Sequence, residues 1–303
     1  TASIMTFNKK IQEDAALNYA KLSYEEGNPF ESVSDVLQNY LKKYPNSNSY
    51  KEINELVVSS FIHQQNYKGA LDYLKKKKSQ ENTALTFEVS LYRGIQLFNE
   101  QKLSESIPYF VTSQSSKNNK ISQKGKYWEA EALYRLGNYD TSLPKFLSLQ
   151  NSLRKDNNNV FPLLTYTIGY AYFKLKNYEK SASTFNLFIT QEEPETLIKN
   201  DAYIRLGDSY FATRNYKDAI KSYEVVITEN GAEADYAQYQ IGMSYGFINE
   251  NEAKITALNK VVNEYTTSTL KDDALYQLAN TYTKIKNNSK AHQAYDRLLS
   301  KYP

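Results

Sequence analysis

The sequence predicts an all-α solenoid, a linear stack of helix hairpins, and three observations favour it. A motif containing Asn-Tyr recurs four times, as QNYKGALDYL from residue 65, GNYDTSLPKF from 137, KNYEKSASTF from 176 and RNYKDAIKSY from 214. Aligning its Tyr along the chain gives eight anchor positions spaced 35 to 39 residues apart. Between anchors, apolar residues recur at three- and four-residue steps, the period of an amphipathic α-helix. One hairpin cannot bury both of its faces, so repeats of this kind stack on their neighbours.

The repeats cover nearly the whole chain and define its expected organisation. We expect a helical lead-in at residues 1–13 and a single solenoid of about eight repeats at 14–303, with repeat starts near residues 14, 51, 87, 123, 162, 200, 235 and 272. The anchors are Phe30, Tyr67, Leu103, Tyr139, Tyr178, Tyr216, Asn251 and Asn288.

Composition excludes several classes of function. The chain has 303 residues, of which 41% are hydrophobic and 23% charged, so it can build a core. Its 37 basic and 34 acidic residues leave a net charge of only +3, which argues against a nucleic-acid partner. The absence of cysteine excludes disulfides, thiolate metal sites and a cysteine nucleophile. No apolar run approaches the roughly 18 residues of a membrane span, so we expect no direct insertion of this segment.

Each repeat reads as two helices joined by a short turn. In the sixth repeat Tyr203, Leu206 and Tyr210 follow helical spacing before the anchor, and Ala219 and Tyr223 follow it afterwards. The Asn before the anchor Tyr is expected to adopt the left-handed conformation that ends a helix. The aromatic anchor then fastens the start of the second helix to the first.

Small residues recur at fixed places in the two helices. They are expected to face one another across the hairpin, so that the helices approach closely and aromatic side chains fill the space beside them. Nine residues before the anchor lie Gly94, Ala130, Gly169, Gly207, Gly242 and Ala279, and three residues after it lie Ala70, Ala219 and Ala291.

The segment YIRLGDSYFATRNYKDAIKSYEVVI, residues 203–227, resembles a tetratricopeptide repeat in its aromatic, Leu-Gly, Tyr, Ala and aromatic positions. The resemblance implies a right-handed superhelix whose first helices line a concave groove for a protein or peptide partner. The segment from residue 263, NEYTTSTLKDDALYQLANTYTKIKNNSKAHQAYDRLLSKYP, is further similar to tetratricopeptide proteins of bacterial cell envelopes. With a Lys-, Asn- and Tyr-rich composition typical of AT-rich genomes, the chain looks most like the long envelope tetratricopeptide proteins of Bacteroidota. That similarity implies a periplasmic or outer-membrane-associated protein, with the cytoplasm as the alternative. We also expect a longer parent chain, and end-to-end self-association of its uncapped repeats.

Candidates for catalysis, cofactor binding and metal binding are few. The only histidines, His63 and His292, lie too far apart in a solenoid to share a metal or a proton relay. Ser142 and Lys145 have Ser-x-x-Lys spacing, but the other motifs of that enzyme class do not accompany them. We expect no catalytic, cofactor or metal site.

The resemblance also implies which residues line the groove, namely those 12, 8, 5 and 4 positions before each anchor. The same positions often pack adjacent repeats, so the aromatic ones are equally open to a structural interpretation. In the sixth repeat the same register also places Ile204 in the groove. The predicted partner-binding residues are Tyr127, Tyr134, Tyr166, Tyr170, Phe173, Asp208, Tyr239, Met243 and Tyr276.

The function predicted from the sequence is that of a non-enzymatic adaptor in an envelope assembly or secretion complex, which holds a partner in this aromatic groove. Two alternatives stay open. One is a substrate-recruiting or regulatory module of a larger enzyme or machine, and the other is a glycan or small-molecule site on the Tyr-rich surface.

Overall fold

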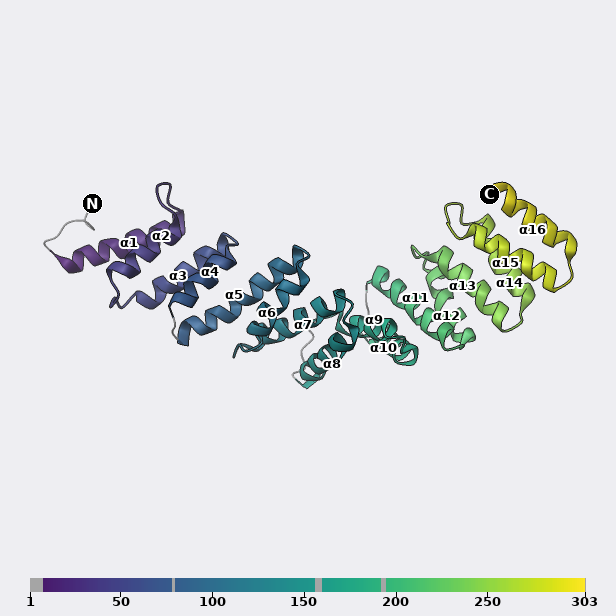
Figure 1. Ribbon diagram of the computed structural model, residues 1–303, viewed down its shortest axis with the longest axis horizontal. Helices are drawn as coiled ribbons and strands as arrows, with labels where there is room; N and C mark the ends of the chain where they lie inside the picture. The colour runs from purple at the N-terminus through teal and green to yellow at the C-terminus, as the bar shows by residue number, and fades with distance from the viewer. Residues whose placement is uncertain (1–7, 78–79, 156–159, 192–194, 303) are drawn as a thin grey trace. The chain divides into compact units, whose positions relative to one another are not determined.

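The computed structural model describes residues 8–77, 80–155, 160–191 and 195–302, and within these ranges it contains sixteen helices and no strand (Figure 1). The predicted all-α class is therefore confirmed. Contacts divide the chain into two units, Thr1–Asn138 and Tyr139–Pro303. The boundary falls between the two helices of the fourth predicted repeat, and the prediction of one continuous right-handed solenoid stays a prediction.

The first unit contains seven helices in the described part of the chain. Each helix packs against the next one along the sequence, as in an α-solenoid. They are α1 (Lys9–Glu26), α2 (Val33–Lys43), α3 (Tyr50–His63), α4 (Tyr67–Lys76), α5 (Gln80–Asn99), α6 (Leu103–Ser113) and α7 (Asn119–Arg135). Of the predicted lead-in, residues 1–7 lie outside the described residues, and α1 already includes residues 9–13.

The second unit contains nine helices in its described residues and follows the same packing order. They are α8 (Tyr139–Lys155), α9 (Leu164–Lys174), α10 (Tyr178–Gln191), α11 (Thr196–Ala212), α12 (Tyr216–Thr228), α13 (Ala234–Phe247), α14 (Asn251–Asn263), α15 (Lys271–Lys284) and α16 (Asn288–Lys301). From the second repeat onward the anchor position is the first residue of an even-numbered helix, from Tyr67 in α4 to Asn288 in α16. The first anchor was wrong: Phe30 is 90% exposed and lies before α2, which begins at Val33.

The turn inside each hairpin differs from the prediction. The left-handed residue is the one before the Asn, as at Gln65, Gly137 and Lys176, where φ is 54°, 82° and 56°. The Asn itself keeps a negative φ, as at Asn66 with φ −87°, where its side chain accepts a hydrogen bond from Gly69 N at 2.9 Å. The prediction was wrong about its conformation, because a short polar side chain serves equally well as the N-cap of the following helix.

The packing of the glycines also differs from the prediction. A Cβ built on Gly207 would lie 2.5 Å from the ring of Tyr223, and one on Gly94 would lie 2.5 Å from the ring of Phe110. The first helix is therefore small where a large ring of the second helix enters, seven residues after the anchor. The expectation that small residues face one another was wrong at these positions, since the missing side chain makes room for a ring rather than for a close helix approach.

Such rings form the centre of the core in the third, fifth and sixth hairpins. Tyr223, Phe110 and Phe185 are fully buried, and each contributes to a cluster that also includes residues of the next hairpin. Burying a large aromatic side chain removes roughly 150–250 Å² from water. Apolar contact therefore holds each of these hairpins to the next one within its unit and fixes the first helices that carry the surface described next.

Candidate protein-interaction surface

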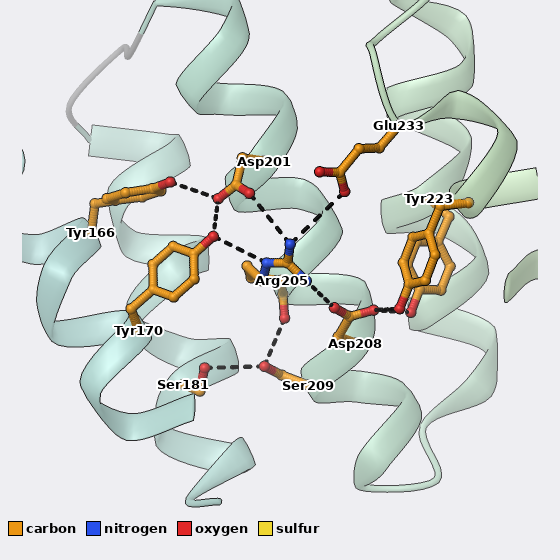
Figure 2. A network of polar contacts seen from close by, with 10 residues as sticks. Tyr166, Tyr170, Ser181, Asp201, Arg205, Asp208, Ser209, Tyr223 and Glu233 are labelled. Atoms are coloured by element: carbon orange, nitrogen blue, oxygen red, sulfur yellow. Dashed lines mark hydrogen bonds and ion pairs between the residues drawn. The ribbon is translucent and has the colours of Figure 1, made fainter. Parts of the chain in front are cut away.

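Arg205, on α11, stands at the centre of a polar network in the second unit (Figure 2). Its Nη1 lies 2.8 Å from Asp208 Oδ2 and its Nη2 lies 3.6 Å from Asp201 Oδ1, so one helix face carries a guanidinium between two carboxylates. Its Nε donates a hydrogen bond of 3.0 Å to the hydroxyl oxygen of Tyr170 on α9. Its Nη2 also lies 3.8 Å from Glu233, just before α13. One side chain thus contacts three consecutive hairpins.

Tyrosine hydroxyls donate hydrogen bonds to the two aspartate carboxylates of this network. Tyr166 and Tyr170 both donate to Asp201 Oδ2, at 2.6 and 2.5 Å. Tyr223 and Tyr236 both donate to Asp208 Oδ1, at 2.8 and 2.9 Å. Hydrogen bonds to a carboxylate are stronger than bonds between neutral groups, so these hydroxyls hold the two carboxylates in place.

The tyrosines of the network are held neutral. Burial raises the pKa of Tyr170 to about 12, and the adjacent Asp201 carboxylate acts in the same direction. Burial likewise raises the pKa of Tyr223, and the negative charge of Asp208 adds to the effect. These hydroxyls therefore remain protonated hydrogen-bond donors throughout the physiological pH range.

The structure brings three of the predicted partner-binding residues, Tyr166, Tyr170 and Asp208, into this network. All three are half-buried, and the two tyrosine rings also pack edge-on against Phe185, with centroids 5.9 and 5.3 Å away. Their hydroxyls and carboxylate are occupied by neighbouring repeats. A role for them in partner binding stays a prediction, and Tyr170 has a structural role in addition.

The other predicted groove residues lie elsewhere on the two units. Phe173 packs edge-on against Tyr178, with centroids 5.4 Å apart, and Tyr127 packs edge-on against Trp128 at 5.5 Å. Tyr134, Tyr239 and Met243 are half-buried. The register position of Ile204 was wrong: its side chain is only 1% exposed and belongs to the core that holds Tyr223.

In the described residues of the second unit, two large aromatic side chains on first helices are exposed. Tyr276 on α15 is 50% exposed, and Phe247 at the end of α13 is 54% exposed. Phe247 is nevertheless fixed in position, because its ring stacks on Tyr216 with an interplanar angle of 6° and a centroid distance of 4.9 Å. Phe211 packs edge-on against both of these rings at 5.4 Å. Rigid, partly exposed aromatic groups are the side chains that contribute most to protein interfaces.

The sequence analysis did not single out Asp201 and Arg205 as site residues, because the predicted groove includes only four positions in each repeat. A usable signal is present in DAYIRLGD, residues 201–208, where Asp, Arg and Asp follow at steps of four and three. That spacing places all three charges on one helix face.

Two side chains that were weighed as catalytic or metal-binding candidates make packing and backbone contacts in the structure. Ser142 is fully buried and donates to the Tyr139 carbonyl at 3.2 Å, and His63 stacks on Tyr24 with centroids 5.8 Å apart. Among the residues that the structure describes, no group of three His, Cys, Asp or Glu side chains could hold a metal ion. No helix within the described ranges is long and apolar enough to cross a membrane.

The fold defines a class of protein: a scaffold of repeated helix hairpins of the kind that serves protein interaction. Models of the tetratricopeptide repeat match residues 14–47, 165–193, 201–230, 236–268 and 273–303. The chain belongs to the tetratricopeptide-repeat family, whose members are generally non-catalytic interaction modules.

Solved structures agree with this fold. The chain is similar to the C-terminal part of a TPR repeat-containing protein from Cytophaga hutchinsonii, with a TM-score of 0.61 and 15% identity over 81% of this chain and 94% of the other. It is also similar to a signal-transduction ATPase with a tetratricopeptide repeat sensor from Pyrococcus horikoshii, with a TM-score of 0.54 and 13% identity over 97% and 53%. The apo form of RapI gives a TM-score of 0.51 and 12% identity over 95% and 86%. No curated protein matches the sequence significantly.

Proposed function

We propose that this chain is a non-enzymatic scaffold that binds a protein partner through the first helices of its second unit, α9, α11, α13 and α15. The observation that carries the proposal is the pair of exposed aromatic side chains on these helices, Phe247 on α13 and Tyr276 on α15. Large aromatic groups that are already ordered bind with a small loss of side-chain entropy.

The polar network supports the proposal because it removes mobility from the surface. Arg205 is about a quarter exposed, so its charge is fixed in direction and still within reach of a partner. A surface whose side chains are ordered before binding gains affinity chiefly by avoiding the cost of ordering them.

A photo-crosslinking residue at Tyr276 tests the proposal in cells that express the full protein. The matched control is the same residue at Lys221, whose side chain is 74% exposed on the second helix α12. We expect one dominant protein adduct from position 276 and a different or weaker pattern from position 221. Equal patterns from the two positions would contradict binding through the first helices.

We further propose that the scaffold acts in the bacterial envelope, in the periplasm or at the outer membrane. The support is the similarity of its C-terminal repeats to envelope tetratricopeptide proteins and its Lys-, Asn- and Tyr-rich composition, with 28 Tyr in 303 residues. Fractionation of cells that express the full gene tests this: recovery in the cytoplasmic fraction alone would contradict it.

A further inference from the structure

A hollow of about 510 Å³ lies between the second helices α12 and α14. Residues of α12, α13 and α14 line it, and α13 packs against both of the other helices. The apolar part of the lining includes Ile227, Ile241 and Tyr245. Glu224 on α12 and Lys260 on α14 form part of its two walls and are exposed, so the hollow is open to solvent.

Gln238 is the unusual member of this lining. The residue is only 5% exposed, yet its side-chain amide makes no hydrogen bond with another residue that the structure describes. Unlike the oxygen Oδ1 of Asn200, which is buried without a partner, the amide of Gln238 is not closed off from solvent. Buried polar groups nearly always have a hydrogen-bond partner. The amide is therefore available, through the hollow, to a ligand that supplies a donor and an acceptor.

The amide of Gln238 suits the main chain of an extended peptide. A Gln side chain carries a carbonyl acceptor and an N–H donor at one planar end. In an extended segment the N–H and C=O of one residue point to the same side, as in the paired bonds of an antiparallel sheet. One Gln amide can therefore exchange two hydrogen bonds with one residue of a peptide, whatever the side chain of that residue.

The openness and the charges of the hollow favour the same occupant. Small-molecule pockets enclose most of their ligand, whereas the exposed walls of this hollow leave room for a chain to enter and leave. Glu224 and Lys260 form no ion pair with the residues that the structure describes. Their opposite charges favour a segment with an acidic side chain towards Lys260 and a basic one towards Glu224.

We propose that this hollow binds an extended segment of a protein partner, whose main chain pairs with the amide of Gln238. A side chain of the segment packs on Ile241 and Tyr245, and an acidic residue of the segment pairs with Lys260. Phe247 and Tyr276 are not part of the lining, so this is a second binding surface and the inference does not depend on the proposed function.

Display of random dodecapeptides against the 303-residue chain, followed by fluorescence anisotropy of the selected peptides, tests this proposal. We expect a group of peptides whose binding Gln238→Met weakens about 10-fold or more, because Met keeps the length of the side chain and removes both hydrogen bonds. Gln240→Met is the matched control and should leave their binding unchanged. Gln240 lies about 200° further around α13 and outside the lining.

N-methylation of the peptide separates main-chain pairing from side-chain contacts. At one residue, methylation should weaken binding to the unmodified chain about 10-fold and should have a much smaller effect on binding to Gln238→Met. Lys260→Glu should shift the charge preference at one peptide position from acidic to basic, whereas Lys217→Glu, exposed on α12 and outside the lining, should not. Gln238→Met should keep the melting temperature, because the amide that it removes has no partner among the described residues.

The proposal is overturned if no selected peptide is sensitive to Gln238→Met, if Gln240→Met has the same effect, or if methylation weakens binding equally in both chains. Peptides that depend on Tyr276 alone also overturn it, while they support the proposed function. Self-association that Gln238→Met abolishes in sedimentation would assign the hollow to a second copy of the chain. Binding of glucose or N-acetylglucosamine oligosaccharides that the same variant abolishes would assign it to a glycan. Either of these results overturns the peptide as its occupant.

Discussion

Replacing Gly207 by Ala tests the finding that a glycine makes room for the ring of Tyr223. The new Cβ would lie 2.5 Å from one ring carbon and 2.8 Å from two others, so the ring has to move by about 1 Å to reach ordinary contact. Tyr223 is fully buried and its hydroxyl donates to Asp208 at 2.8 Å, so it cannot shift without disturbing that bond. Overpacking a core costs about 1–3 kcal/mol, and a weakened hydrogen bond costs about 1 kcal/mol more.

The gain in helix propensity opposes this loss. Ala is favoured over Gly in a helix by about 1 kcal/mol, so Gly207→Ala should destabilise the second unit by roughly 2 kcal/mol. Urea unfolding followed by far-ultraviolet circular dichroism should show a lower midpoint for the variant.

Gly246→Ala, on α13, is the matched control for this experiment. Its Cβ would meet the flexible side chain of Lys254 at 2.9 Å, which can move aside. We expect this variant to keep or raise the midpoint, by up to about 1 kcal/mol of helix propensity. If Gly207→Ala were as stable as Gly246→Ala, the ring of Tyr223 would not be the reason for glycine at position 207.

Three further predictions concern the turns and the network. Asn66→Ala should cost about 1 kcal/mol because it removes an N-cap bond, whereas Asn215→Ala, at a cap whose side chain makes no such bond, should cost only a few tenths; urea midpoints compare them. Tyr170→Phe should cost about 1–3 kcal/mol in the same assay, because it removes the hydroxyl that joins Asp201 to Arg205 and leaves the ring in place; unchanged stability would contradict a structural role for that hydroxyl. Burial raises the pKa of Tyr127 and Tyr170 in the folded chain from 10.0 to about 12. Between pH 10 and 12 only the unfolded chain therefore loses the protons of these two tyrosines, so the free energy of unfolding should fall in that range. Below pH 10 the two tyrosines should leave it unchanged. Ultraviolet titration of tyrosine ionisation alongside the urea midpoints checks this, and a stability independent of pH up to 12 would refute it.

The repeat architecture was predictable from the sequence because hydrophobic period and anchor spacing are local properties of the chain. Tyr178 and Tyr216 begin second helices as the pattern indicates. The partner of each glycine was not predictable in this way, since position 207 can face either an alanine or a ring, and only the rotation of one helix against the other decides. The role of Asn66 was missed for a related reason: the same residue type suits a left-handed turn and an N-cap.

The network of Arg205 shows how much of the candidate site can be predicted from the sequence. Its two carboxylates come from the same helix and leave a visible pattern in the sequence, Asp201 and Asp208 flanking the arginine. The hydroxyls that complete it come from residues up to 35 positions away, as in the bond from Tyr166 to Asp201. Such partners are set by the stacking of one hairpin on the next, which no local pattern records.

The reach of Arg205 has a consequence for cooperativity. In a solenoid each repeat interacts with its immediate neighbours, so an end repeat can open while the middle stays folded. Arg205 belongs to the hairpin of α11 and α12, and its guanidinium contacts the neighbouring hairpin on either side, through Tyr170 on α9 and Glu233 just before α13. Opening any one of the three exposes or unpairs charges in the others, which couples them into one unfolding unit longer than a repeat. Amide hydrogens of α9, α11 and α13 should then exchange together rather than in sequence from the end.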